Sequence, residues 1–145
     1  GDSCFVSFTF IGEYTGSIKD QYFPYIRPQE NGNKTDVKWA TFENDKGDGL
    51  IIYGIPLFNL SAHQYSLENL TKATHTYMIK DNGPVTVNMD HKVMGLGGDD
   101  SWNPRTHKEY LIGPGVYNYS FILRFSDNLK TDIKRSIDSR MNSSN

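Results

Sequence analysis

The residue best suited to chemistry on a ligand is Trp102, which lies in a glycine-rich segment at residues 94–104. Its neighbours favour tight turns, because glycine admits positive φ and aspartate and serine hydrogen-bond nearby backbone. They include Gly95, Gly97, Gly98, Asp99, Asp100 and Ser101. Pro104 fixes its own φ and favours extended geometry just before it. We therefore expect a stiffened loop whose indole could stack on a sugar ring or anchor a partner, the alternative being a tryptophan folded into the core.

The two carboxylates of this segment could be read as an acid–base pair. Asp99 and Asp100 are adjacent, so in extended backbone they would point to opposite faces. In a loop, aspartate more often hydrogen-bonds the turn itself. The sequence therefore predicts a supporting role for both and no catalytic residue among them.

General acid–base chemistry could also use the histidines together with Glu30. The histidines are His63, His75, His91 and His107. No spacing singles out a pair, and we interpret them as polar residues with ordinary hydrogen bonds. The scattered histidines and acids also lack the close ligand spacing of a zinc or EF-hand site, so we expect neither a metal nor another cofactor in this chain.

The composition favours short strands and turns over helices. The 145 residues contain nine Tyr, eight Phe, thirteen Gly and six Pro, and we expect a single domain spanning 1–145. A net charge of −2 offers no basic face for nucleic acid or an anionic membrane. No apolar run reaches the roughly 18 residues of a membrane span, and the lone Cys4 excludes an internal disulfide. The compartment stays open.

Hydrophobic patterning predicts strands separated by turn residues. The expected strands are 4–11, 35–42, 50–54, 57–61, 76–80, 85–90, 109–112 and 116–125. Segment 12–20 is interpreted as a connection and 21–28 as an edge or rim segment. We expect one hairpin between 35–42 and 50–54, and another between 109–112 and 116–125 whose second arm is a central strand.

Alternation within 35–42 places Val37, Trp39 and Thr41 on one face and Lys38 and Phe42 on the other. A serine N-cap predicts a helix over 66–73. The polar tail, 126–145, could form a short surface helix over 127–140. These elements together predict an all-β antiparallel sandwich.

A polar cluster precedes the first of these hairpins. Arg27, Glu30 and Asn31 could line a ligand groove or lock a corner through a salt bridge and an Asn-Gly turn. Pro28 and Gly32 already favour a rigid turn here, so we prefer the corner.

Three segments resemble the C-terminal domain of the large bacterial β-galactosidases of glycoside hydrolase family 2. They are 22–39, 58–61 and, above all, the Met-Gly-Leu-Gly-Gly-Asp-Asp-Ser-Trp run at 94–102. Their order and intervals agree with the family, and the resemblance extends from about Gly12 to Phe125. It covers only the C-terminal half of the family domain, and residues 2–11 and 126–145 match nothing in it.

This resemblance implies an antiparallel super-sandwich related to galactose mutarotases, known as the small-chain or fifth domain. In the family, the tryptophan of the Gly-Gly-Asp-Asp-Ser-Trp motif reaches the active-site mouth and stacks on the sugar in the leaving-group or acceptor position. Trp102 is the matching residue, with Gly98, Asp99, Asp100 and Ser101 as its supporting loop. The catalytic glutamates belong to a barrel domain, so hydrolysis by this chain alone is not expected.

The sequence therefore favours a non-catalytic part of a β-galactosidase, an enzyme that hydrolyses terminal β-D-galactosides. It would complete the active-site rim and contact a lactose-type sugar and the remaining domains or subunits. The alternatives are a free-standing carbohydrate-binding β-sandwich module, a mutarotase-like protein, or a purely structural β-domain. A large exposed apolar surface beside Trp102 would favour a part of a β-galactosidase over a free-standing carbohydrate-binding module.

Overall fold

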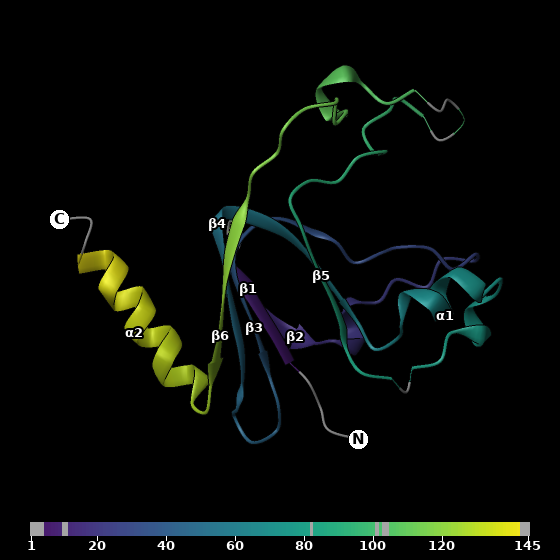
Figure 1. Cartoon of the computed structure of the whole chain (residues 1–145). Coiled ribbons are helices and arrows are strands. Elements are labelled where there is room, and N and C mark those ends of the chain that lie inside the picture. The colour runs from purple at the N-terminus through teal and green to yellow at the C-terminus, as the bar shows by residue number, and fades with distance from the viewer. Residues whose placement is uncertain (1–4, 10–11, 82, 101, 103–104, 143–145) are drawn as a thin grey trace.

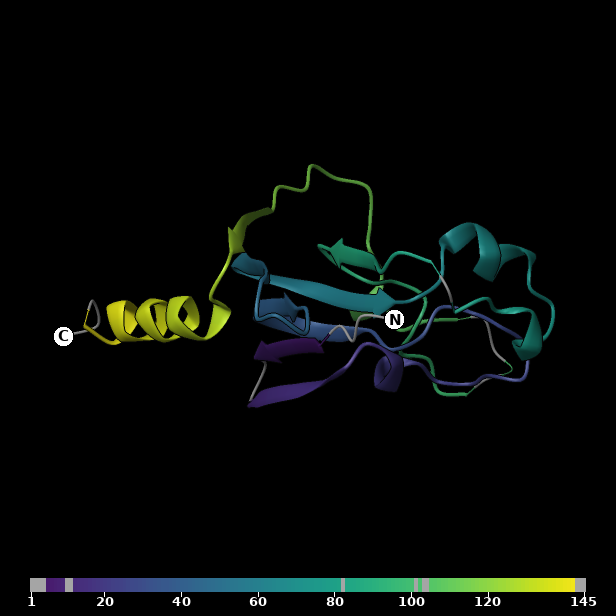
Figure 2. The ribbon, with the colours of Figure 1, turned by 90° about the horizontal axis from the view of Figure 1, so that it is seen from below.

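Six antiparallel strands and two α-helices make up the computed structural model, which describes residues 5–9, 12–81, 83–100, 102 and 105–142. The strands run in the order β2-β1-β3-β4-β5, and β6 also pairs with β4. The helices α1 and α2 lie at opposite ends of the molecule (Figure 1; Figure 2). Within the described residues, no helix has both the length and the apolar character needed to cross a membrane.

The centre of the sheet is the hairpin of β3 (Lys34–Glu43) and β4 (Gly49–His63). This is the hairpin that the sequence predicts, with an Asn-Asp-Lys-Gly-Asp turn between its strands. The expectation of a separate strand at 57–61 is wrong, because that segment continues β4 past a cis Ile55–Pro56 peptide. Each half of β4 gains its own neighbour, since 49–55 pairs with β6 and 59–63 with β5.

A register irregularity in β3 decides which side chains enter the core. The pairing with β4 shifts between Lys34 and Val37, where Asp36 adopts a positive φ of 54°, and again between Val37 and Trp39, whose partners Phe58 and Tyr53 are separated by the bend of β4. A bulge adds a residue to one strand and so reverses the inward and outward alternation beyond it. Val37 consequently shares the core with Phe42, and the predicted grouping of Val37 with Trp39 is wrong.

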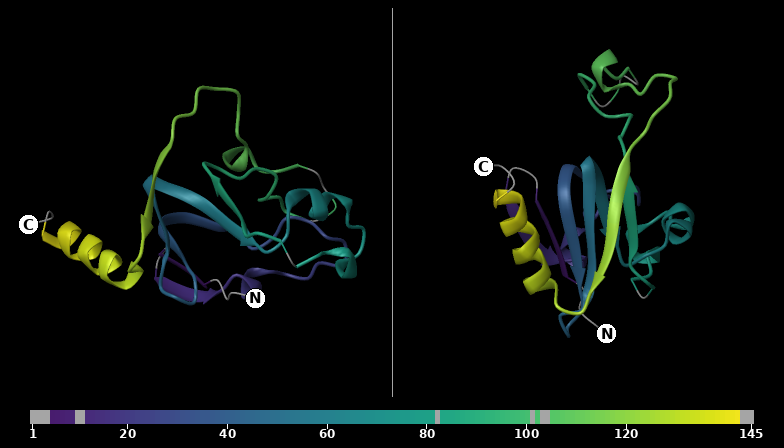
Figure 3. Two further views of the ribbon diagram at one scale, coloured as in Figure 1. Left: turned by 60° about the horizontal axis from the view of Figure 1, so that its bottom comes forward. Right: turned by 60° about the vertical axis from the view of Figure 1, so that its left-hand side comes forward.

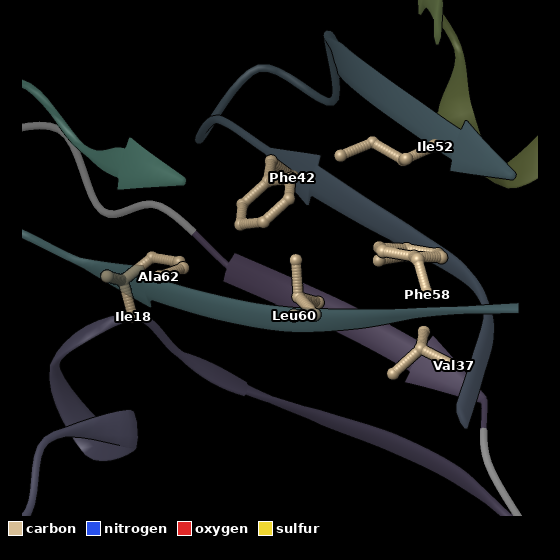
Figure 4. Packing of buried hydrophobic residues seen from close by; sticks show 8 residues of the cluster. Ile18, Val37, Phe42, Ile52, Phe58, Leu60 and Ala62 are labelled. Atoms are coloured by element: carbon tan, nitrogen blue, oxygen red, sulfur yellow. The ribbon is translucent and has the colours of Figure 1, made fainter. Parts of the chain in front are cut away.

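The core lies between β3, the two halves of β4 and the end of β2 (Figure 4). Its buried members are Ile18, Val37, Ala40, Phe42, Ile52, Phe58, Leu60 and Ala62. Ile52 and Leu60 belong to different halves of β4 yet meet in one cluster, so the strand bends between them. Gly54 permits the bend, because a Cβ there would lie 2.8 Å from the Phe58 ring.

At the N-terminal side, β1 (Phe5–Thr9) pairs with both β2 (Glu13–Ser17) and β3. The first strand, expected over 4–11, is confirmed over the described residues 5–9, and residues 4, 10 and 11 lie outside them. The interpretation of 12–20 as a connection is wrong, because β2 and the 3-10 helix η1 (Lys19–Gln21) occupy it. Gln21 ends η1, and the rest of segment 21–28 contains no strand. Most of its side chains are exposed, as expected for a rim segment.

After β4, the chain forms α1 (Leu67–Lys72), η2 (Thr76–Met78) and β5 (Thr86–Asp90). The predicted N-cap is confirmed, because the Ser66 hydroxyl accepts from the backbone N–H of Asn69 at 3.1 Å. The predicted strand at 76–80 is wrong, and the 3-10 turn of η2 takes its place.

The last strand, β6 (Ser120–Ser126), pairs with β4 and not with 109–112. Residues 108–110 form the 3-10 helix η3 (Lys108–Tyr110), so the predicted final hairpin is wrong. The expectation of a central strand is wrong too, because β6 has one paired neighbour among the described strands and exposes residues 120–125. The exposed side chains lie on both faces of the strand and include Phe121, Ile122 and Phe125.

The polar tail forms α2 (Leu129–Asn142), which confirms the predicted helix. Leu129 is buried against the β3–β4 turn, where its Cδ1 lies close to Gly49. Asp132 ties the first turn of α2 to β6 by accepting from the Ser126 hydroxyl at 2.7 Å. The antiparallel all-β fold with two short helices is thus confirmed and is consistent with a β-sandwich, while the mutarotase-like topology remains a prediction.

Candidate functional site

The glycine-rich segment belongs to a long excursion between β5 and β6 that rises away from the sheet (Figure 1; Figure 3). We call residues 91–119 the Trp102 arm. Its outgoing part continues from β5, and its returning part passes through η3 and leads into β6. The arm is therefore fixed to the sheet by its two ends.

Aromatic contacts hold the two ends of the arm together at its base. The His91 ring stacks on Tyr119 with centroids 5.2 Å apart, and the Tyr119 hydroxyl donates to the Met89 carbonyl at 2.9 Å. The Lys92 ammonium lies 5.5 Å from the centre of the Tyr117 ring, within cation–π range. The outgoing and returning parts consequently leave the sheet as one unit.

Closer to the tip, two glycines let the outgoing and returning parts approach each other. Gly97 has a φ of 95°, and a Cβ there would lie 2.2 Å from the Tyr110 ring. A Cβ on Gly98 would lie 2.9 Å from the carbonyl oxygen of Arg105. Both positions therefore need glycine. Gly97 combines a positive φ with a close contact, whereas Gly98 needs only the space. This is the close approach that the sequence predicts for the loop.

Trp102 is 91% exposed and projects from the arm. Its backbone N–H donates to Asp100 Oδ1 at 2.9 Å, an interaction across two residues that is typical of an aspartate turn. The alternative of a core tryptophan is therefore wrong. Two expected supports of the loop, Ser101 and Pro104, lie outside the described residues.

The neighbouring carboxylate has a different partner. Asp99 Oδ1 lies 2.6 Å from His107 Nε2, and the backbone N–H of His107 donates to the Gly97 carbonyl at 3.1 Å. Asp99 and Asp100 thus engage the loop itself, in line with a supporting role. His107 is a residue that sequence reasoning left among the unassigned histidines, because its partner is decided by how the arm folds.

A groove of about 680 Å³ lies at the base of the arm. One side comes from the bend of β4 and from Asp36, and the other from arm residues that include Lys92, Glu109 and Tyr110. Trp102 is not among the lining residues. The indole and this groove therefore do not form one shared ligand site.

The second polar cluster is the corner before β3, and Asn31 holds it. The Asn31 side chain accepts from the Phe23 backbone N–H at 2.9 Å and donates to the Tyr65 hydroxyl at 3.0 Å. Gly32 follows with a φ of 71°. Arg27 and Glu30 make no ion pair with each other in the described part of the chain, so the corner forms without the expected salt bridge.

His63 is buried beside this corner and stacks on Tyr65 with centroids 4.8 Å apart. Its Nε2 lies 2.9 Å from the Asn31 carbonyl oxygen, and since a carbonyl only accepts, Nε2 carries the proton. Nδ1 is buried without a partner among the described residues. Glu30 is close enough for its charge to act on His63. Neither ring nitrogen of His63 is available to a sugar, however, because Nε2 is hydrogen-bonded and Nδ1 is buried. This geometry does not support mutarotase-type acid–base catalysis by His63 and Glu30.

We expect the stability of the fold to decrease as the pH falls below about 6.5, the ordinary histidine value. Burial lowers the pKa of His63 in the folded chain, and the nearby Lys34 charge adds to this. The unfolded chain therefore binds the His63 proton more readily, so stability is complete above that pH and decreases as the pH approaches the lowered pKa. Urea midpoints measured from pH 7.5 downward would show this decline.

The matched control is His63→Gln, which keeps an N–H donor near Asn31 but cannot titrate. It should remove the His63 contribution to the decline. An identical pH profile for the variant would show that other groups cause the effect.

The remaining histidines lie apart from one another. His75 precedes η2, His91 is at the base of the arm and His107 is near its tip. Across the described residues, no group of three or more His, Cys, Asp and Glu side chains is placed to hold a metal ion.

The family model for the β-galactosidase small chain matches residues 8–123. This chain belongs to the β-galactosidase small-chain family. Its similarity to a β-galactosidase of Priestia megaterium is 46% identity over 112 residues, which is 77% of this chain. A β-galactosidase of Pseudoalteromonas haloplanktis is 43% identical over 113 residues, and one of Alteromonas mediterranea is 39% identical over 110 residues.

The shared region is a small part of each relative. It covers 77% and 78% of this small-chain sequence but only 11% and 10% of the Priestia and Pseudoalteromonas enzymes. The family match includes β2 to β5, the corner at Asn31, the Trp102 arm and parts of β1 and β6, whereas α2 lies beyond it.

Proposed function

We propose that this chain is a non-catalytic part of a β-galactosidase that hydrolyses terminal β-D-galactosides, and that Trp102 completes the rim of its active site. The observation that carries the proposal is a fully projecting indole, held by its own loop, in a chain of the β-galactosidase small-chain family. Trp102 would stack on the sugar in the leaving-group or acceptor position, such as the glucose unit of lactose. No metal or other cofactor is needed in this chain for that role.

The indole is suited to this role by what surrounds it. A tryptophan with so little contact to its own chain gains most of its burial from a ligand or from another protein surface. The groove at the base of the arm does not include Trp102. The site that Trp102 completes would therefore be formed mainly by other domains of the enzyme.

Apolar surface beside the arm supports contact with those domains. Phe121, Ile122, Leu123 and Phe125 on β6 are exposed, as are Leu96, Leu111 and Val116 on the arm. Soluble proteins rarely leave so many neighbouring apolar side chains in water, and such surfaces usually mark interaction sites. We propose that other domains or subunits of the β-galactosidase cover them. A free-standing carbohydrate-binding module would have no such need.

We expect no hydrolysis of a chromogenic β-galactoside by this chain alone. A retaining glycosidase needs two carboxyl groups about 5 to 5.5 Å apart on either side of the scissile bond. The acids at the arm tip instead hold the turn, since Asp99 contacts His107 and Asp100 contacts the Trp102 backbone. The assay compares the purified chain with the complete enzyme.

The control is a double variant of the chain, Asp99→Asn with Asp100→Asn. Turnover by the purified chain that disappears in this variant would contradict the non-catalytic role. Turnover that the variant retains would point to a contaminating enzyme.

A further inference from the structure

We propose that His107 is a positioning residue for Trp102, acting through its hydrogen bond to Asp99. The proposal rests on the proposed function of Trp102 and adds the group that holds the indole where a sugar can meet it. His107 does not itself touch the sugar. Its effect is on the range of positions that the loop allows the indole to adopt.

The first observation is that His107 links both parts of the arm at the tip. It belongs to the returning part, and its two hydrogen bonds reach the outgoing part. The backbone N–H donates to the Gly97 carbonyl at 3.1 Å, and Nε2 donates to Asp99 Oδ1 at 2.6 Å. The Tyr110 ring, also from the returning part, lies against Gly97. His107 thus helps to close the loop that presents Trp102.

The second observation is the short path from this closure to the indole. Asp99 is followed by Asp100, whose carboxylate accepts from the Trp102 backbone N–H at 2.9 Å. His107 fixes the first aspartate, and the second aspartate fixes the backbone of Trp102. Because the indole is 91% exposed, its place depends on this backbone and not on packing around the ring.

Stacking on a sugar depends on a narrow range of ring positions and orientations, and a misplaced binding group loses much of its effect. Without the Nε2 hydrogen bond, the loop would sample more positions and spend less time in the productive one. The Asp99–His107 pair is exposed, so its loss should have a modest effect. We therefore expect about a two- to fivefold loss of acceptor affinity, which corresponds to about 0.4 to 1 kcal/mol.

The experiment uses the complete enzyme and two substitutions of matched size. His107→Phe keeps a ring but has no donor, whereas His107→Gln places an amide N–H near the position of Nε2. The readout is the glucose concentration that gives half-maximal transfer of galactose from a chromogenic galactoside to glucose. His75→Phe is the control, because His75 is an exposed histidine that precedes η2, outside the arm.

For His107→Phe we expect that glucose concentration to rise about two- to fivefold, with His107→Gln and His75→Phe close to the unsubstituted enzyme. The His75→Phe control should also leave the turnover number for hydrolysis without glucose unchanged, because His75 lies outside the arm. In a Trp102→Ala background, His107→Phe should have no further effect, because the residue acts through the indole.

Three results would overturn the proposal alone: no change in His107→Phe, an equal loss in His107→Gln, or an undiminished loss in the Trp102→Ala background. If Trp102→Ala itself leaves glucose binding unchanged, the proposed function is wrong, and this inference is wrong with it. Unfolding curves of the variants separate positioning from a loss of the fold.

Discussion

Replacing Trp102 with alanine in the complete enzyme should raise the glucose concentration for half-maximal transfer about ten- to a hundredfold. A stack of a flat ligand face on an aromatic ring is worth about 1 to 3 kcal/mol, and the substitution removes it entirely. The side chain is 91% exposed, so truncation should change the free energy of unfolding by less than about 1 kcal/mol. Transfer kinetics and urea denaturation measure the two quantities.

Trp39→Ala provides the contrast, because Trp39 is buried in the central strand β3. Truncating a buried tryptophan should cost about 3 to 5 kcal/mol of folding free energy. A loss in that range for Trp102→Ala would refute the rim role and assign the glycine loop to stabilising the fold. Unchanged transfer with unchanged stability would remove Trp102 from sugar binding altogether.

A large loss of stability is also expected for Phe58→Ala. Phe58 is 1% exposed and lies where the two halves of β4 meet the β3 side of the core. Its ring packs against Gly54 at the bend of the strand. The truncation removes buried apolar contacts and leaves a cavity, which together cost about 3 to 5 kcal/mol. Typical domains are stable by only about 5 to 15 kcal/mol, so much of the fold's stability should be lost.

The matched control is Phe125→Ala, which removes the same side chain from β6, where it is 84% exposed. In the chain alone, this change should affect the free energy of unfolding by less than about 1 kcal/mol. Urea denaturation followed by circular dichroism compares the two variants. Equal losses would contradict the core described here, since burial would then not distinguish the two phenylalanines.

Phe125→Ala also tests the proposed contact surface, in a different setting. If other domains cover β6 in the complete enzyme, the same substitution should be more costly there than in the isolated chain. The expected difference arises because Phe125 is buried only after assembly.

The sequence by itself determined features that depend on a few neighbouring residues. The serine cap of α1 and the β3–β4 hairpin follow from backbone preferences and short-range hydrogen bonds, and Gly32 adopts the positive φ of 71° that glycine favours. The glycine-rich loop is of the same kind, because its turn residues hold Trp102 out of the core. Its motif is also long enough to indicate the β-galactosidase family from the sequence alone.

Only the tertiary structure decided which distant segments meet. β6 pairs with β4 and not with the nearer 109–112, and β2 forms in a stretch with weak strand character because β1 lies beside it. The register shift between Val37 and Trp39 decided which side chains of β3 enter the core, and His107 found its partner in Asp99 through the folding of the arm. Strand pairing and burial are settled by contacts between residues far apart in sequence, which local propensity does not encode.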